Sequence, residues 1–246
     1  MGLKTNIIPY RLSDALTFTH KDGTPAREPA IARLSIARAT TDGTTTNGST
    51  TDGTTTNGAT TDGATTNGAT TNGATTVGAT TDGATTDGAT TNGCRFDGPT
   101  LILIADMTDS DIYNTAERNN VKTWLTGDVL EFFFQPPGRA DYYEFHVTPT
   151  GKTLQLHMPT EQAAFNIPFE DKICETGFRH SVEVEQGLWR VRMEIPLSAL
   201  NCQTAAGARF IVCRQNYSHA WTEPDISVTS PLKGSVHSPD EWLRIV

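Results

Sequence analysis

Residues 124–149, WLTGDVLEFFFQPPGRADYYEFHVTP, decide how the rest of the chain is organised. Valine, leucine and phenylalanine fill most of residues 128–134, and Glu131 interrupts them. This composition is typical of a strand that is buried on both faces or nearly so. Residues 135–141 then bring two prolines, which lack the N–H that a sheet ladder requires, and a glycine that admits a reversal. A turn is therefore predicted directly after the strand.

Two further strands are predicted to follow this turn. In residues 142–148, the polar side chains of Glu144, His146 and Thr148 alternate with aromatic and aliphatic ones. Such alternation indicates that one face of the strand meets a core and the other meets solvent or a ligand. Residues 153–158 alternate in the same way after another short turn. Three sequential strands with short connections predict an antiparallel meander.

Short segments of strand composition recur through the rest of the non-repetitive sequence. Many short strands separated by Pro and Gly turns favour a sandwich, so we predict an all-β fold, a jelly-roll-like β-sandwich of two antiparallel sheets. Within it, Trp189 is expected in the core, and Trp242 is expected to close the sandwich. The additional strands are predicted at residues 7–10, 16–18, 30–38, 101–105, 188–195 and 208–215, with a loop at 216–233.

A low-complexity repeat occupies residues 40–94, as eleven consecutive units of the form Thr-Thr-(Asp/Asn/Val)-Gly-(Thr/Ser/Ala/Cys). It contains too few large hydrophobic residues to offset the cost of ordering the backbone, about 1 kcal/mol or more per residue. A flexible insertion is therefore predicted, flanked by one domain made of residues 1–39 and 95–246. The alternative is a threonine-rich solenoid with an ice-like binding surface, turning at Asn-Gly and Asp-Gly.

Composition excludes several classes of partner. The chain has a formal net charge of −9, part of which comes from aspartates in the repeat, and it has no Lys/Arg cluster. Nucleic acid and anionic membrane surfaces are therefore poor candidates for binding partners of this protein. We also expect the protein to be a monomer. The four cysteines are widely spaced, which favours buried or free thiols over a metal site; they are Cys94, Cys174, Cys202 and Cys213.

The sequence as written also bears on location. Residues 1–9 contain no apolar run long enough for a signal-peptide core, and no membrane-length apolar stretch follows. These features predict an unexported, cytoplasmic protein.

An acidic turn follows the strand predicted at residues 101–105. Asp109 and Asp111, with Asp106 nearby, are spaced so that alternate oxygens can meet a hard cation, which makes calcium a candidate ligand. The alternative is that these side chains form a turn or cap a short helix-like stretch at residues 112–118.

Six motifs that occur in one order resemble the family 9 carbohydrate-binding modules and their family 9-like relatives. The resemblance covers residues 95–246 well and residues 7–39 faintly. It implies a sandwich of two antiparallel sheets and a non-catalytic role in carbohydrate binding, in a family that is mostly secreted. The motifs are Asp109-Ser110-Asp111-Ile112, Trp124-x3-Asp128-Val129-x-Glu131-Phe132, Tyr143-Glu144-Phe145-x-Val147-x-Pro149-x-Gly151, Trp189-x5-Ile195-Pro196-Leu197-x-Ala199-Leu200, Arg209-x4-Arg214-x-Asn216 and His237-Ser238-Pro239-Asp240-Glu241-Trp242.

Sugar recognition needs flat apolar surfaces for the C–H faces of a pyranose and fixed polar groups for its hydroxyls. The resembling family grips a terminal sugar between two tryptophans, for which Trp124 and Trp221 are the candidates, Trp221 being the better match by position. Packing is an equally good account of Trp124, and an ion pair with Arg190 or Arg192 is an equally good account of Glu131. The candidate hydroxyl partners are Arg118, Glu144, Arg214 and Asn216.

Two other functions remain open. Related sandwiches bind haem through Met and His for electron transfer, and His146, His157 and Met158 lie on adjacent predicted strands. A glycoside hydrolase would need two carboxylates about 5 to 9 Å apart, and no motif singles out such a pair. The sequence contains no Gly-x-Ser-x-Gly, His-Glu-x-x-His or phosphate-binding Gly-rich loop.

Overall fold

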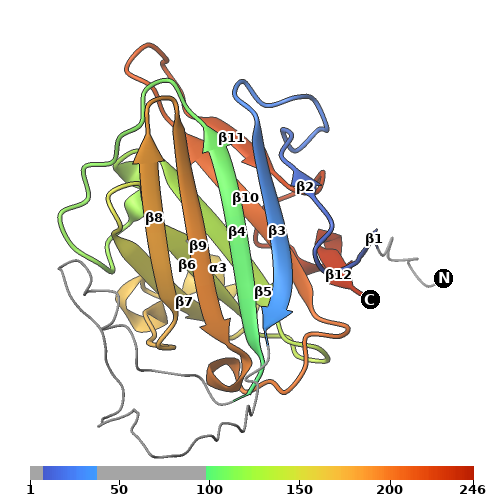
Figure 1. The fold of residues 1–246 in the computed structure, drawn as a ribbon. Helices are drawn as coiled ribbons and strands as arrows, with labels where there is room; N and C mark the ends of the chain where they lie inside the picture. Colours follow the sequence, from blue (N-terminus) through green and yellow to red (C-terminus); the bar gives the residue numbers. More distant parts are fainter. Residues whose placement is uncertain (1–7, 38–97) are drawn as a thin grey trace, which may run out of the picture. The chain divides into compact units, whose positions relative to one another are not determined.

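The computed structural model describes residues 8–37 and 98–246, which form two β-sheets (Figure 1). The repeat of residues 40–94, with its flexible-loop and threonine-solenoid interpretations, and Cys94 lie outside the described residues. None of the helices described in these two segments is long and apolar enough to span a membrane.

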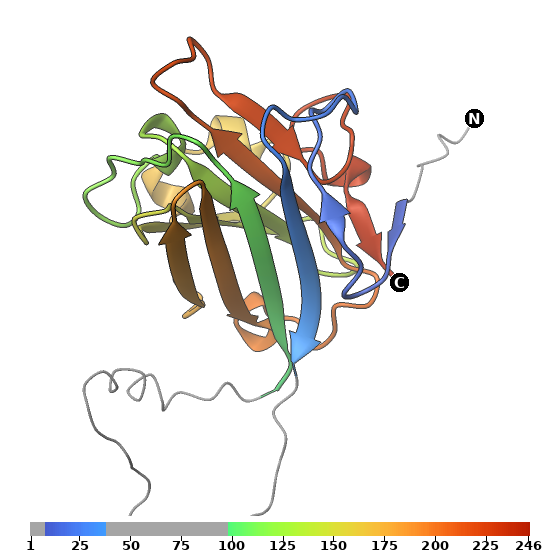
Figure 2. The same ribbon diagram turned by 45° about the horizontal axis from the view of Figure 1, so that its top comes forward.

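Sheet B contains five strands that pair antiparallel throughout. The strand that ends at Ala37 and the strand that begins at Thr100 are neighbours in this sheet, and these two residues pair with each other (Figure 2). The strands, in their order across the sheet, are β2 (Leu16–Thr17), β3 (Ala30–Ala37), β4 (Thr100–Thr108), β9 (Leu188–Pro196) and β8 (Arg179–Glu185).

Sheet A contains seven strands and includes the predicted meander. All its pairs are antiparallel except the one between its first and last strands in the chain. The two-sheet all-β sandwich is thus confirmed, with a single parallel pair added among the described residues. The path is β1 (Ile8–Tyr10), β12 (Leu243–Ile245), β10 (Arg209–Asn216), β5 (Val129–Gln135), β6 (Tyr142–Val147) and β7 (Thr153–Met158), with β11 (Asp225–Val228) on β10.

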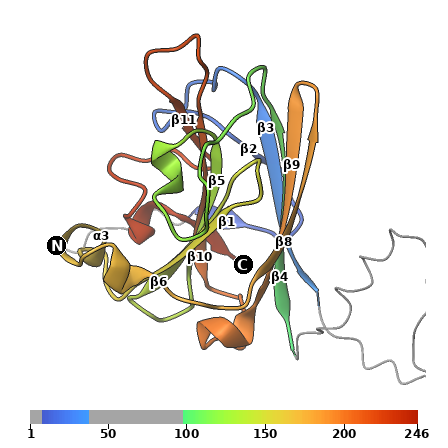
Figure 3. The same cartoon turned by 90° about the vertical axis from the view of Figure 1, so that its left-hand side faces the viewer.

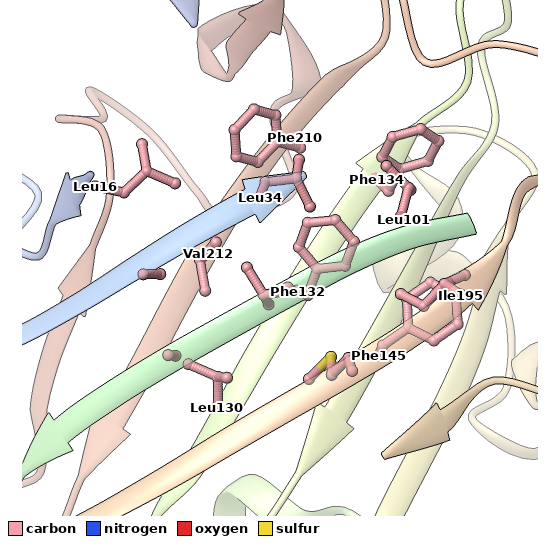
Figure 4. Close-up of a cluster of buried hydrophobic side chains, with 14 of the residues drawn as sticks. Leu16, Leu34, Leu101, Leu130, Phe132, Phe134, Phe145, Ile195, Phe210 and Val212 are labelled. Atoms are coloured by element: carbon pink, nitrogen blue, oxygen red, sulfur yellow. The ribbon is translucent and has the colours of Figure 1, made fainter. Parts of the chain in front are cut away.

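The core between the sheets is built from every second side chain of the central strands. Phe132 and Phe134 of β5 meet Leu34 of β3 and Leu101 of β4, and all four are fully buried (Figure 4). Each such side chain contributes about 1.5–3 kcal/mol through burial. Trp189 of β9 also lies in this core, as predicted.

The outer face of sheet A is covered as well, which explains why β5 shows no alternation. Phe133, Tyr142, Leu156 and Trp242 form a second buried cluster there. Short helices overlie it, and α3 lies on the side of sheet A that faces away from sheet B (Figure 3). Trp242 therefore packs outside the sandwich rather than between its sheets. The covering helices are α3 (Ala163–Asn166), η3 (Glu170–Lys172) and η5 (Pro239–Glu241).

The predicted helix-like stretch at residues 112–118 is wrong. Asn114 forms a bridge with Gly127, and its side-chain amide donates hydrogen bonds to the carbonyls of Thr123 and Asp128, at 3.1 and 3.0 Å. These contacts to a later segment replace the local ones that a helix would need. The predicted loop at residues 216–233 likewise contains β11.

A cavity on the outer face of sheet A as the candidate binding site

A cavity of about 360 Å³ lies on the outer face of sheet A. Side chains of β5, β6, β7 and β10 line it, together with the 3-10 helix η2 (Thr123–Leu125), the stretch 164–172 and residues 236–237. This volume falls within the range of small-molecule pockets, about 300–1,000 Å³.

Aromatic rings form one side of the cavity. The indole of half-buried Trp124 lies 5.5 Å from the His146 ring and 5.9 Å from the Phe169 ring, measured between centroids. The Trp124 backbone carbonyl accepts a 2.6 Å hydrogen bond from the Tyr217 hydroxyl, which anchors η2 to the loop after β10. The ammonium group of Lys122 sits 5.3 Å from the Phe169 centroid.

Polar side chains from three adjacent strands meet in the same cavity. Glu131 of β5 pairs across the sheet with His146 of β6, and Glu144 lies two residues earlier on the same face. His146 Nε2 is 3.2 Å from Glu144 Oε2, and Gln215 Nε2 donates to Glu131 Oε2 at 2.7 Å. We call Glu131, Glu144 and His146 the polar floor.

Burial sets the protonation of the polar floor. It raises the pKa of Glu131 to about 7, an effect that His146 opposes and Glu144 reinforces. Burial also lowers the pKa of His146, but the two carboxyl groups outweigh it, and the net pKa is raised. Glu131 and His146 therefore each keep their proton to a higher pH than the free side chain does.

Of the sequence-predicted sugar contacts, the structure brings Trp124 and Glu144 together at the cavity. Trp221 lies in the loop between β10 and β11, where the Arg27 guanidinium stacks 4.7 Å from its ring centroid. Trp221 is not among the residues that line this cavity. Arg118 is exposed and also lies outside the lining.

Arg214 and Asn216 lie on the opposite face of β10 and do not reach the cavity. Arg214 is 0% exposed, and its Nη2 donates to Asp109 Oδ2 at 3.1 Å. Burial lowers the pKa of Arg214 and raises that of Asp109, while their mutual attraction opposes both shifts. Asn216 follows Arg214 by two residues in β10, lies on the same face of the strand and is also buried. Both residues are buried in the interior and do not line this cavity.

The predicted calcium ligands Asp109 and Asp111 form hydrogen bonds with protein groups. Besides its ion pair with Arg214, Asp109 accepts a 2.9 Å hydrogen bond from the backbone N–H of Asp111. Asp111 Oδ2 accepts hydrogen bonds from the Ser218 hydroxyl and the His219 backbone N–H, at 2.9 and 2.6 Å. These bonds lower the pKa of Asp111. The acidic turn thus fixes the loop after β10, in keeping with the turn interpretation.

Only part of the proposed haem ligand set converges. His146 and Met158 both line the cavity, and Met158 also belongs to the second buried cluster. His157 instead pairs with Asp141 at 2.8 Å and stacks on Tyr143, which belongs to the core between the sheets. The set of His146, His157 and Met158 is therefore not brought together at one place.

Sequence reasoning missed part of the cavity. The predicted ion pair of Glu131 with Arg190 or Arg192 is not formed, because Arg190 pairs with Asp106 and Arg192 pairs with Glu194. The register of β5 on β6 would have placed Glu131 next to His146. Phe169 carries no sequence signal, because it lies outside any strand pattern.

Comparisons with known proteins address the fold. No known protein-family model matches the chain. It is 24% identical to an extracellular protein of Arthroderma benhamiae over 159 aligned residues. The aligned region covers 59% of this chain and 69% of that protein. A candidate carbohydrate-binding protein of Bacteroides uniformis superposes with a TM-score of 0.57 at 12% identity, over 97% of this chain and 98% of that one.

A second solved structure is a family 9 carbohydrate-binding module of Caldicellulosiruptor kristjanssonii in complex with cellotriose. It superposes with a TM-score of 0.51 at 9% identity, over 98% of this chain and 92% of that one. The architecture therefore agrees with the one that the ordered motifs implied. The chain has the two-sheet fold of the family 9 carbohydrate-binding modules.

Proposed function

We propose that this protein is a non-catalytic carbohydrate-binding module and that a sugar binds in the cavity on the outer face of sheet A. The observation that carries the proposal is the combination of a half-buried indole with carboxylate and amide groups in one cavity of about 360 Å³. The shared fold with a module solved with cellotriose supports it.

The two sides of the cavity suit the two sides of a sugar ring. The indole of Trp124 offers a flat face for pyranose C–H groups, and Phe169 extends that apolar wall. Glu131 and Glu144 can accept hydrogen bonds from hydroxyls, and the amide of Gln215 holds Glu131 in place. Because these acceptors are buried, a ligand without hydroxyls would leave them unpaired and bind poorly.

Retention on soluble glycans tests the proposal. Affinity electrophoresis against a panel of β-glucans, xylans and mannans, followed by calorimetry with cellotriose and other short oligosaccharides, should identify at least one ligand. Trp124→Ala should weaken its binding at least tenfold through the lost stacking surface.

Trp221→Ala is the matched control, because it removes an indole outside the cavity. It should bind like the wild type. The proposal is overturned if no glycan is retained, or if Trp221→Ala loses binding while Trp124→Ala keeps it.

A further inference from the structure

The polar floor has the chemistry of a metal-binding site. Glu131, Glu144 and His146 each present one ligand atom, and these atoms all lie within 4.8 Å of one another. All three residues are buried, with at most 4% exposure. Acidic clusters on a protein surface are common, but two carboxylates beside an imidazole inside a protein require a compensating cation or proton.

An unsatisfied oxygen marks where that cation is needed. Glu144 Oε1 is buried and has no hydrogen-bond partner among the described residues, although Glu144 lines the cavity. The two lysines of the lining do not fill this role. Lys172 Nζ donates to the Ala164 carbonyl at 2.9 Å, and Lys122 lies over the Phe169 ring. An orphaned carboxylate oxygen at this depth is costly unless something binds it.

We propose that Glu131, Glu144 and His146 bind a divalent transition-metal ion of the Zn²⁺ type. One imidazole nitrogen with two carboxylate oxygens is a mixed set that Zn²⁺ accepts, whereas Ca²⁺ and Mg²⁺ prefer oxygen alone. Zn–N and Zn–O bonds of about 2.0–2.2 Å place tetrahedral ligands about 3.4 Å apart. The 3.2 Å separation of His146 Nε2 and Glu144 Oε2 is close to this value.

Neighbouring side chains are placed to orient the ligands. Thr123 Oγ1 lies 2.9 Å from His146 Nδ1, so the hydroxyl oxygen can accept a hydrogen bond from Nδ1–H, and the Nε2 lone pair is then free for the metal. Gln215 fixes the Glu131 carboxylate through its 2.7 Å hydrogen bond. Two carboxylates neutralise a divalent charge, and the cavity leaves a position open for water or another small ligand.

Metal retention by the whole chain tests this site. Protein stripped with EDTA is dialysed against Zn²⁺, and separately against Ca²⁺ and Mg²⁺, and the bound metal is measured by mass spectrometry. We expect about one Zn²⁺ per chain and no retained Ca²⁺ or Mg²⁺. His146→Gln and Glu131→Gln should each weaken Zn²⁺ binding more than tenfold, while His157→Gln, which alters a histidine outside the cavity, should not.

Quenching by Co²⁺ gives a readout that leaves the floor intact. Because the Trp124 and His146 rings are 5.5 Å apart, Co²⁺ at the floor should quench Trp124 fluorescence. The quenching should persist in Trp221→Phe and disappear in Trp124→Phe. No retained Zn²⁺, or quenching unchanged in Trp124→Phe, overturns the proposal. Neither measurement contains sugar, so the metal site and the carbohydrate proposal fail separately.

Discussion

Glu131 makes stability depend on pH, because its pKa in the folded protein is about 7 against 4.5 for the free group. The folded state therefore binds this proton more tightly than the unfolded chain does. The free energy of unfolding therefore falls as the pH rises from about 4.5 to about 7. Above pH 7 the total loss is on the order of 3 kcal/mol. Glu131→Gln removes the titration and keeps an acceptor for Gln215. In EDTA, we expect the variant to gain thermal stability over the wild type between pH 5 and 8. If the melting temperatures of the wild type and the variant changed in parallel from pH 5 to pH 8, Glu131 would not be the group that titrates.

Arg214 is the second residue whose environment leads to a prediction. Arg214→Met leaves the Asp109 carboxylate buried and unpaired, at 1% exposure. Removing one partner of a buried ion pair typically costs about 3–5 kcal/mol, so the urea midpoint should fall sharply. Arg118→Ala, an exposed arginine, should leave it unchanged. If Arg214→Met were fully stable and lost only sugar binding, the earlier expectation of a sugar contact would be right instead.

At the scale of elements, the position of η2 depends on Gly127. Its φ is +134°, and a Cβ there would lie 2.5 Å from the Tyr113 carbonyl oxygen and 2.8 Å from Asn114 Cα. Gly127→Ala should therefore shift the segment that carries Trp124, and cost more than about 1 kcal/mol. We expect a lower melting temperature together with weaker glycan binding. Gly138→Ala, at φ +73° with open space around its Cβ, is the control for backbone strain alone. If both variants weakened glycan binding equally, Gly127 would not have a specific role in positioning Trp124.

Most of the strands could be predicted from sequence, but β8, β11 and β12 were not. The face on which each side chain lies could not always be predicted either. Residues 129–134 show no alternation because both faces of β5 are buried. In β10, the two-residue spacing correctly places Arg214 and Asn216 on one face, but only the register with β5 shows that this face is the interior. Gln215, between them, reaches the cavity. Trp221 could not be placed because a loop has no periodicity.

At the scale of the molecule, the long segment between β3 and β4 leaves and rejoins sheet B at paired residues, Ala37 and Thr100. A short turn can therefore connect the two strands. Each doubling of the loop length raises the entropic cost of closing the loop by only about 0.6 kcal/mol. The cavity is built on sheet A, in the other layer of the sandwich.

We therefore predict that replacing residues 40–94 with a short Gly-Ser linker leaves glycan affinity unchanged and alters the melting temperature by only a few degrees. Differential scanning calorimetry and glycan titration of the shortened protein beside the full chain measure both quantities. The matched control replaces the same residues with a Gly-Ser linker of equal length, which separates loss of this sequence from loss of loop length. A fall of many degrees in both variants would mean that the repeat stabilises the domain through contacts of its own. A loss of affinity without a loss of stability would mean that it contributes to ligand binding.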